Sequence, residues 1–128
     1  MYHVKYPSTK IWEYEERELS DVRGGPRLFV RLLIGKVTNE NRLKQIFRGI
    51  PVVQNDPSWT CSTWMMNALA AIEADGTAVG TSVLDWATMR DWAITYVAQK
   101  IAAGRFDDPV GELPKPTWDL IEGIETVS

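Results

Sequence analysis

The sequence contains almost none of the residues from which disulfide frameworks and zinc sites are built. Its 128 residues include one cysteine, Cys61, and one histidine, His3. A single cysteine excludes an internal disulfide, and one cysteine with one histidine is too few for a Cys/His zinc site. We therefore expect no bound metal and no other cofactor.

Long hydrophobic runs and an excess of positive charge are also missing. The longest apolar stretches, such as Leu32–Ile34, fall far short of the about 20 residues that a membrane span needs, and no apolar signal segment follows Met1. The 14 Lys and Arg residues are outnumbered by 17 Asp and Glu residues, giving a net charge of −3. These features predict a soluble, cytoplasmic protein whose partners include neither nucleic acid nor a membrane.

The first forty residues favour strands. Tyr2–Tyr6 and Ile11–Leu19 are rich in aromatic and β-branched side chains, and the segment Pro7–Lys10 supplies turn residues between them. These two segments predict a β-hairpin. A Gly- and Pro-containing break follows, and the apolar run Leu28–Val37 is predicted to be one further strand.

The remaining residues favour helices. Three are predicted: one from Asn41 to Gly49, one from a cap at Ser58 or Thr60 to Asp75, and one from a capping box at Ser82 to about Gly104. Residues 77–81 are expected to form a loop between the last two helices. The segregation of strands and helices predicts an α+β fold, in which a small antiparallel N-terminal sheet packs against three C-terminal helices.

The chain is long enough for one compact domain with a core of ordinary size. We expect that domain to cover residues 1–106. Residues 107–128 contain Pro109, Pro114 and Pro116, so they are expected to form a Pro-rich tail, with a short helix at Thr117–Ile121.

Cys61 is the leading candidate for a catalytic residue. In the first turn of a helix it would lie near unpaired backbone N–H groups and the positive end of the helix dipole, which favour a thiolate. A thiol nucleophile also needs a base, and His3 is the one imidazole that the sequence offers. Glu13 or Glu15, on the paired strand, would orient the imidazole ring as the third member of a triad does.

Structural interpretations of the same residues remain open. Cys61 begins an apolar stripe that continues through Trp64, Ala68 and Ile72, which is typical of a side chain that fills the core. A histidine three residues from a chain end is often solvated. Sequence alone does not choose between a catalytic and a structural cysteine.

Tryptophan is unusually frequent. The six tryptophans are Trp12, Trp59, Trp64, Trp86, Trp92 and Trp118. Trp59 and Trp64 lie on either side of Cys61, so a cavity near the thiol would have aromatic walls. Trp59, Trp64, Trp12 and Asn55 are therefore predicted to contact a substrate or ligand, although indoles also fill gaps between helices and sheets.

Four segments carry a resemblance to a known family. They are Tyr2–Lys5, Trp12–Glu15, Pro51–Cys61 and Ala78–Trp86. Together they resemble a family of small uncharacterised proteins from filamentous fungi, and the stretch Asn-Asp-Pro-x-Trp-x-Cys is the most specific part of the match. This resemblance extends to about Phe106 and implies no activity, because the function of that family is unassigned.

The order of a His-bearing strand, further strands and a Cys at a helix start is also similar to permuted papain-like enzymes, the group that includes lecithin retinol acyltransferase. In that group two strand histidines precede the cysteine. The resemblance implies that His3 corresponds to the second, orienting histidine, and that the strand with the first histidine is absent here. His3 would then have taken over as the base, or the protein would bind without cleaving.

These observations support three hypotheses about function. The first is a cysteine-dependent hydrolase or acyltransferase acting on an ester, thioester or amide of an apolar substrate. The second is a non-catalytic binding protein for an apolar metabolite or a peptide. The third is a small isomerase or cyclase of fungal secondary metabolism that uses a Trp-lined cavity. An exposed edge at the N-terminal strand also predicts a homodimer.

Overall fold

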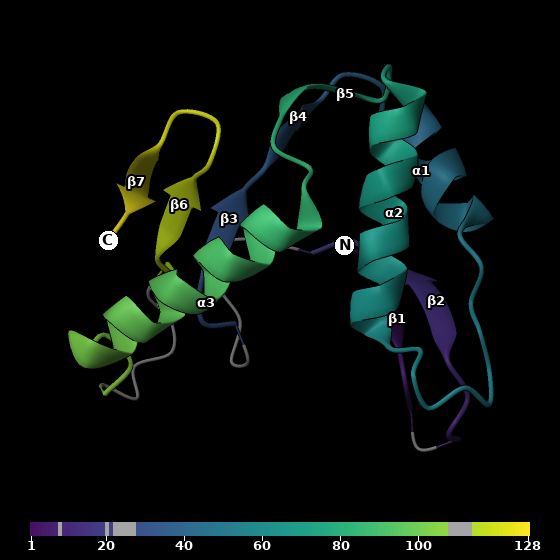
Figure 1. The fold of residues 1–128 in the computed structure, drawn as a ribbon, viewed down its shortest axis with the longest axis horizontal. Coiled ribbons are helices and arrows are strands. Elements are labelled where there is room, and N and C mark those ends of the chain that lie inside the picture. Colours follow the sequence, from purple (N-terminus) through teal and green to yellow (C-terminus); the bar gives the residue numbers. More distant parts are fainter. Residues whose placement is uncertain (8, 20, 22–27, 108–113) are drawn as a thin grey trace. The chain divides into compact units, whose positions relative to one another are not determined.

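The chain folds into two compact units, each built from two separate segments. The computed structural model describes residues 1–7, 9–19, 21, 28–107 and 114–128. The first unit contains Met1–Leu19 and Lys36–Gly80, and the second contains Ser20–Gly35 and Thr81–Ser128. The mixture of helices and strands in both units confirms the α+β class (Figure 1). The division differs from the expected single domain with a separate tail, because residues 117–127 belong to the second unit.

The elements follow one another in the order β1, β2, β3, β4, α1, α2, β5, α3, β6, β7. Their bounds are Tyr2–Lys5, Glu13–Glu16, Arg31–Leu33, Gly35–Val37, Glu40–Gly49, Cys61–Asp75, Val79–Ser82, Trp86–Ala102, Thr117–Asp119 and Ile124–Val127.

The predicted hairpin is present in the first unit. β1 and β2 pair antiparallel, with His3 opposite Glu15 and Val4 opposite Tyr14. Since successive side chains of a strand point to opposite faces, Val4 and Tyr14 share one face of the hairpin, and His3 and Glu15 share the other. Val4 is buried, so the face that it shares with Tyr14 is the one that packs on the core.

Helices α1 and α2 begin and end where local sequence signals place them. The side chain of Asn39 accepts a hydrogen bond from the amide of Arg42 and caps α1. The amide of Thr60 donates to the hydroxyl of Thr63 at the start of α2. α2 ends at Gly76, whose φ of 70° is the left-handed conformation that glycine adopts without strain.

The core of the first unit lies between the hairpin and the two helices. Four of its buried residues form one cluster, Val4, Trp59, Trp64 and Ala68, with partly buried Tyr2, Trp12, Tyr14, Phe47, Ile50, Val52 and Val53 packed against them. Leu43, Leu69, Ile72 and Ala78 are also buried in this unit. The expected sheet-on-helix packing is thus found for α1 and α2 only, because α3 belongs to the second unit. On this inner face the Glu16 carboxylate also forms a bidentate ion pair with Arg48 of α1, whose Nε and Nη2 lie 2.6 and 2.9 Å from the two carboxylate oxygens.

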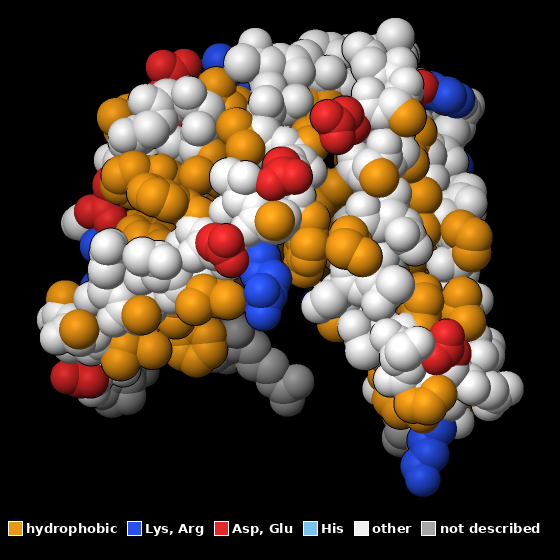
Figure 2. Space-filling model, in the orientation of Figure 1, with side chains coloured by type: hydrophobic (Ala, Val, Ile, Leu, Met, Phe, Trp, Pro, Cys, Tyr) orange, Lys and Arg blue, Asp and Glu red, His pale blue; other side chains and the backbone are white. Residues whose placement is uncertain are grey.

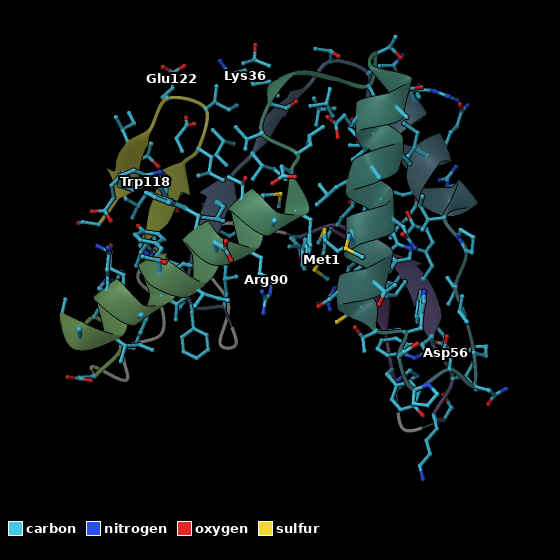
Figure 3. The ribbon with its side chains drawn as sticks, viewed as in Figure 1. Met1, Lys36, Asp56, Arg90, Trp118 and Glu122 are labelled. Carbon is cyan, nitrogen blue, oxygen red and sulfur yellow. The ribbon has the colours of Figure 1, made fainter. Side chains whose placement is uncertain are left out.

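The second unit combines parallel and antiparallel pairing. β3 pairs parallel with β6, and β6 pairs antiparallel with β7. Figure 3 labels Trp118 on β6. α3 packs on this sheet through Tyr96, which is buried and whose ring centroid lies 6.0 Å from that of Trp118. The Tyr96 hydroxyl donates to the Glu125 carboxylate of β7 at 2.6 Å, and the Lys100 ammonium forms an ion pair with the same carboxylate at 2.7 Å.

Several predictions of secondary structure were wrong. The run Leu28–Val37 is two strands in different sheets, and β5 replaces the loop expected at residues 77–81 and pairs with β4. α3 begins after Asp85, whose side chain accepts from the amide of Thr88, so the cap is not Ser82. The short helix expected at Thr117–Ile121 is strand β6 and the start of a turn.

Candidate functional site

A pocket opens in the first unit where the hairpin turn meets the connection before α2. Its volume is ≈ 480 Å³, and its lining is Tyr6, Lys10, Trp12, Gln54, Asn55, Asp56, Pro57, Trp59 and Thr60. Figure 3 labels Asp56 in this connection, near the start of α2, and Figure 2 shows hydrophobic, acidic and basic side chains close together at this end of the unit. Three of the four residues predicted to contact a ligand, Trp12, Trp59 and Asn55, are therefore in one pocket.

Three aromatic rings form the apolar part of the pocket. The ring centroids of Trp12 and Trp59 are 5.3 Å apart, and the planes meet at 80°. Tyr6 lies 5.0 Å from Trp12 at 43°. Trp59 is almost wholly buried, whereas Tyr6 is 53% exposed. The arrangement is a corner of two indoles with an exposed phenol beside it.

The Gln54 side chain fixes the position of Trp12. Its Oε1 accepts from the Trp12 amide at 2.9 Å, and its Nε2 donates to the Trp12 carbonyl at 2.8 Å. A side-chain amide thus imitates the hydrogen bonding that a neighbouring strand would provide just before β2. One N–H group and one acceptor position of the Gln54 amide are thus used in holding the pocket wall.

A tight turn places Asp56 and Trp59. Asn55 has a φ of 58°, a left-handed conformation that asparagine tolerates better than most residues. The Asp56 carboxylate accepts from the amide and the hydroxyl of Ser58, at 2.9 and 2.6 Å, and the Trp59 amide donates to the Asp56 carbonyl at 3.1 Å. Asp followed by Pro57 is a typical start of such a turn.

The pocket lining carries one charge of each sign. Hydrogen bonds from the Ser58 hydroxyl and amide hold the pKa of Asp56 below its usual range, so this carboxylate is ionised at neutral pH. Both bonds go to Oδ1, and no described residue donates to Oδ2. The Lys10 ammonium makes no ion pair with any residue that the structure describes, and Lys10 lines the pocket from the connection between β1 and β2.

The proposed base and its orienting carboxylate are together on the outer face of the hairpin. The imidazole Nε2 of His3 lies 3.0 Å from Oε1 of Glu15. Lys5 also donates to Glu15, and these two hydrogen bonds, that of Lys5 first, lower the pKa of Glu15 to about 2. Glu13 lies across the hairpin from Lys5. Of the two carboxylates considered in the sequence, Glu15 is the one bonded to the imidazole.

Cys61 is placed apart from this pair. It is the first residue of α2, as expected, but it is exposed and so does not fill the core. Its sulfur forms no hydrogen bond with His3 or with any other residue in the described part of the chain. Alternation along β1 explains this separation, because His3 points away from the face on which Val4 packs against α2.

Trp64 also lies outside the pocket. It is buried beside Tyr14 and Phe47, whose ring centroids are each 5.7 Å from its own.

The sequence did not predict four of the residues that line the pocket, which are Tyr6, Lys10, Gln54 and Asp56. The signal for Asp56 was available, since Asp-Pro-Ser directly before a tryptophan predicts a turn that holds both residues on one side of the chain.

The described residues offer neither a cluster of metal ligands nor a helix that could span a membrane. Within the described ranges, no three His, Cys, Asp or Glu side chains are grouped in a way that could hold a metal ion. None of the described helices combines the length and the apolar character that crossing a membrane requires.

Residues 1–127 match the model of a family of unknown function, DUF6914. The chain belongs to this family. The match includes the C-terminal hairpin of β6 and β7, so the DUF6914 family model covers both units. Comparison with curated proteins gave no match, and comparison with solved structures gave none either.

Proposed function

We propose that this DUF6914 protein is a binding protein for a small organic ligand, and that the ligand occupies the pocket of the first unit. The observation that carries the proposal is the corner formed by Trp12 and Trp59, with polar groups of Asn55 and Asp56 at its edge. Ligand sites commonly combine aromatic walls with a few polar groups that fix orientation.

The energetics of the pocket favour a ligand with an apolar or aromatic part. Burial of an aromatic surface contributes about 25 cal/mol per Å², and a well-oriented ring pair adds about 0.5–1.5 kcal/mol. The Trp12 backbone is held in place before binding by Gln54, which lowers the entropy cost of ordering the site. These features support specific binding and require no reaction.

A fragment screen by NMR tests this proposal. We expect fragments from a library of mixed charge to shift the backbone amides around Trp12 and residues 54–60, and Tyr6→Leu to weaken the binding. Phe29→Leu is the matched control, because Phe29 is 55% exposed against 53% for Tyr6 but lies in the second unit. If no fragment binds, or if the two variants lose affinity equally, the proposal is wrong.

A cysteine-dependent hydrolase or acyltransferase is the second proposal. The observation that favours it is the His3–Glu15 hydrogen bond, which is the orienting pair that a thiol mechanism uses. It requires Cys61 and His3 to meet in a conformation other than the one described. In that case Cys61→Ala and His3→Ala would each abolish hydrolysis of an aryl ester, since members of a catalytic pair act as a unit. The binding proposal expects Cys61→Ala to leave ligand affinity unchanged.

A further inference from the structure

Building on the proposed binding function, we infer that the ligand carries a methylated ammonium group. In this arrangement the exposed Tyr6 ring and the half-buried Trp12 ring contact its methyl groups, Trp59 contributes the small part of its surface that is exposed, and the carboxylate of Asp56 balances the charge. The shared chemistry is an organic cation with a rounded, weakly hydrated head.

The angle between the indoles favours such a head over a flat ligand. A flat ring or a sugar stacks best on a single exposed plane, whereas Trp12 and Trp59 meet at 80° and Tyr6 is tilted by 43° from Trp12. A rounded group that enters this corner can touch more than one ring at the same time. Cation–π attraction to several rings is the usual means by which proteins recognise quaternary ammonium groups.

The charges of the lining give the inference its sharpest test. Asp56 keeps Oδ2 free of hydrogen bonds from the described residues, and this oxygen can face a cation without breaking the turn. Lys10 lines the same pocket and repels a cation. A cationic ligand therefore predicts opposite effects when the two charges are removed, and an anionic ligand predicts the reverse signs.

The first arm of the experiment compares a cation with its neutral counterpart. Choline and 3,3-dimethylbutan-1-ol have the same shape, but only choline is charged. In an NMR titration of the intact chain we expect choline to bind about tenfold more tightly, which corresponds to the strength of a partly desolvated cation–π contact. Equal affinity for the two compounds, or tighter binding of the alcohol, would overturn the inference.

The second arm uses variants at exposed positions. Asp56→Asn keeps the acceptor for Ser58 and removes the charge, so choline should bind about fivefold more weakly. Lys10→Asn should strengthen binding by about the same factor, and asparagine tolerates the φ of 59° at this position. Tyr6→Phe should retain affinity and Tyr6→Leu should lose it, because leucine keeps apolar area without a π face. If Asp56→Asn strengthened choline binding and Lys10→Asn weakened it, or if neither variant changed it, the inference would be overturned.

The third arm identifies the source of the cation. The same trimethylammonium head is present in free choline, in a peptide with trimethyllysine and in vesicles of phosphatidylcholine. The one of these three that binds with the highest affinity identifies the source of the cation. If all three fail while neutral or anionic fragments still bind at Tyr6, the binding function stands and the cation inference falls. If the fragment screen also finds nothing, both fall.

Discussion

The Gln54 side chain provides a direct way to perturb the pocket without touching its rings. Gln54→Ala removes both hydrogen bonds to the Trp12 backbone, which are 2.9 and 2.8 Å long. A net hydrogen bond contributes about 0.5–1.5 kcal/mol, and two would sum to about 1–3 kcal/mol. Water can replace these exposed bonds, so we expect a loss near the lower end, about 1–2 kcal/mol in the free energy of unfolding of the first unit.

The assay is urea unfolding followed by NMR signals of β1 and β2. Gln54→Glu is the matched control, because a carboxylate still accepts from the Trp12 amide but cannot donate to its carbonyl. At low pH the protonated carboxyl can accept from the Trp12 amide and donate to the Trp12 carbonyl, so the stability of Gln54→Glu should approach that of the wild type. At neutral pH the carboxylate makes only the first of these bonds, so the stability should lie between those of the wild type and Gln54→Ala. The same variants should bind the pocket ligand more weakly in the same order. Wild-type stability and affinity for Gln54→Ala would refute the idea that this side chain holds Trp12 in place.

Three further predictions concern acid stability, helix ends and association. Hydrogen bonds from Lys5 and the neighbouring imidazole lower the folded-state pKa of Glu15 to about 2, below its usual 4.5. The ionised Glu15 side chain therefore stabilises the fold above pH 4.5, and this stabilisation is lost as the pH falls toward 2. Glu15→Gln should flatten this part of the acid unfolding curve. Gly76→Ala, at a φ of 70°, should cost about 1–2 kcal/mol in urea unfolding. Gly49→Ala, at the last residue of α1 and with nothing within 4 Å of the new methyl group, should instead stabilise by about 0.5–1 kcal/mol. β1 has β2 as its one partner strand in the described part of the chain, so we expect light scattering to find dimers at micromolar concentration; a monomer would show that the open edge is covered.

The parts of the fold that sequence predicted depend on local signals. Asn39 and Gly76 cap their helices through bonds to residues three or four positions away, and such spacing can be read directly from the chain. The parallel pairing of β3 with β6 joins segments far apart in the sequence, and no local pattern indicates it. The strands involved have three residues each, too short for a clear period of two.

The candidate site was predicted in part for the same reason. Trp59 and Asn55 lie in one continuous segment, and their turn chemistry follows from Asp56 and its neighbours. Whether His3 faces Cys61 depends on which face of the hairpin is buried. Once Val4 is known to be buried, alternation places His3 on the opposite face, and a composition-based argument cannot supply that fact.

The indole N–H resonances show directly where a ligand binds, because the tryptophans lie at different places in the two units. With the protein saturated by its best-binding fragment, we expect large shifts for Trp12 and Trp59, which line the pocket, and small ones for Trp92 and Trp118, whose rings contact each other in the second unit. Shifts confined to Trp92 and Trp118 would mean that the pocket of the first unit is not the binding site.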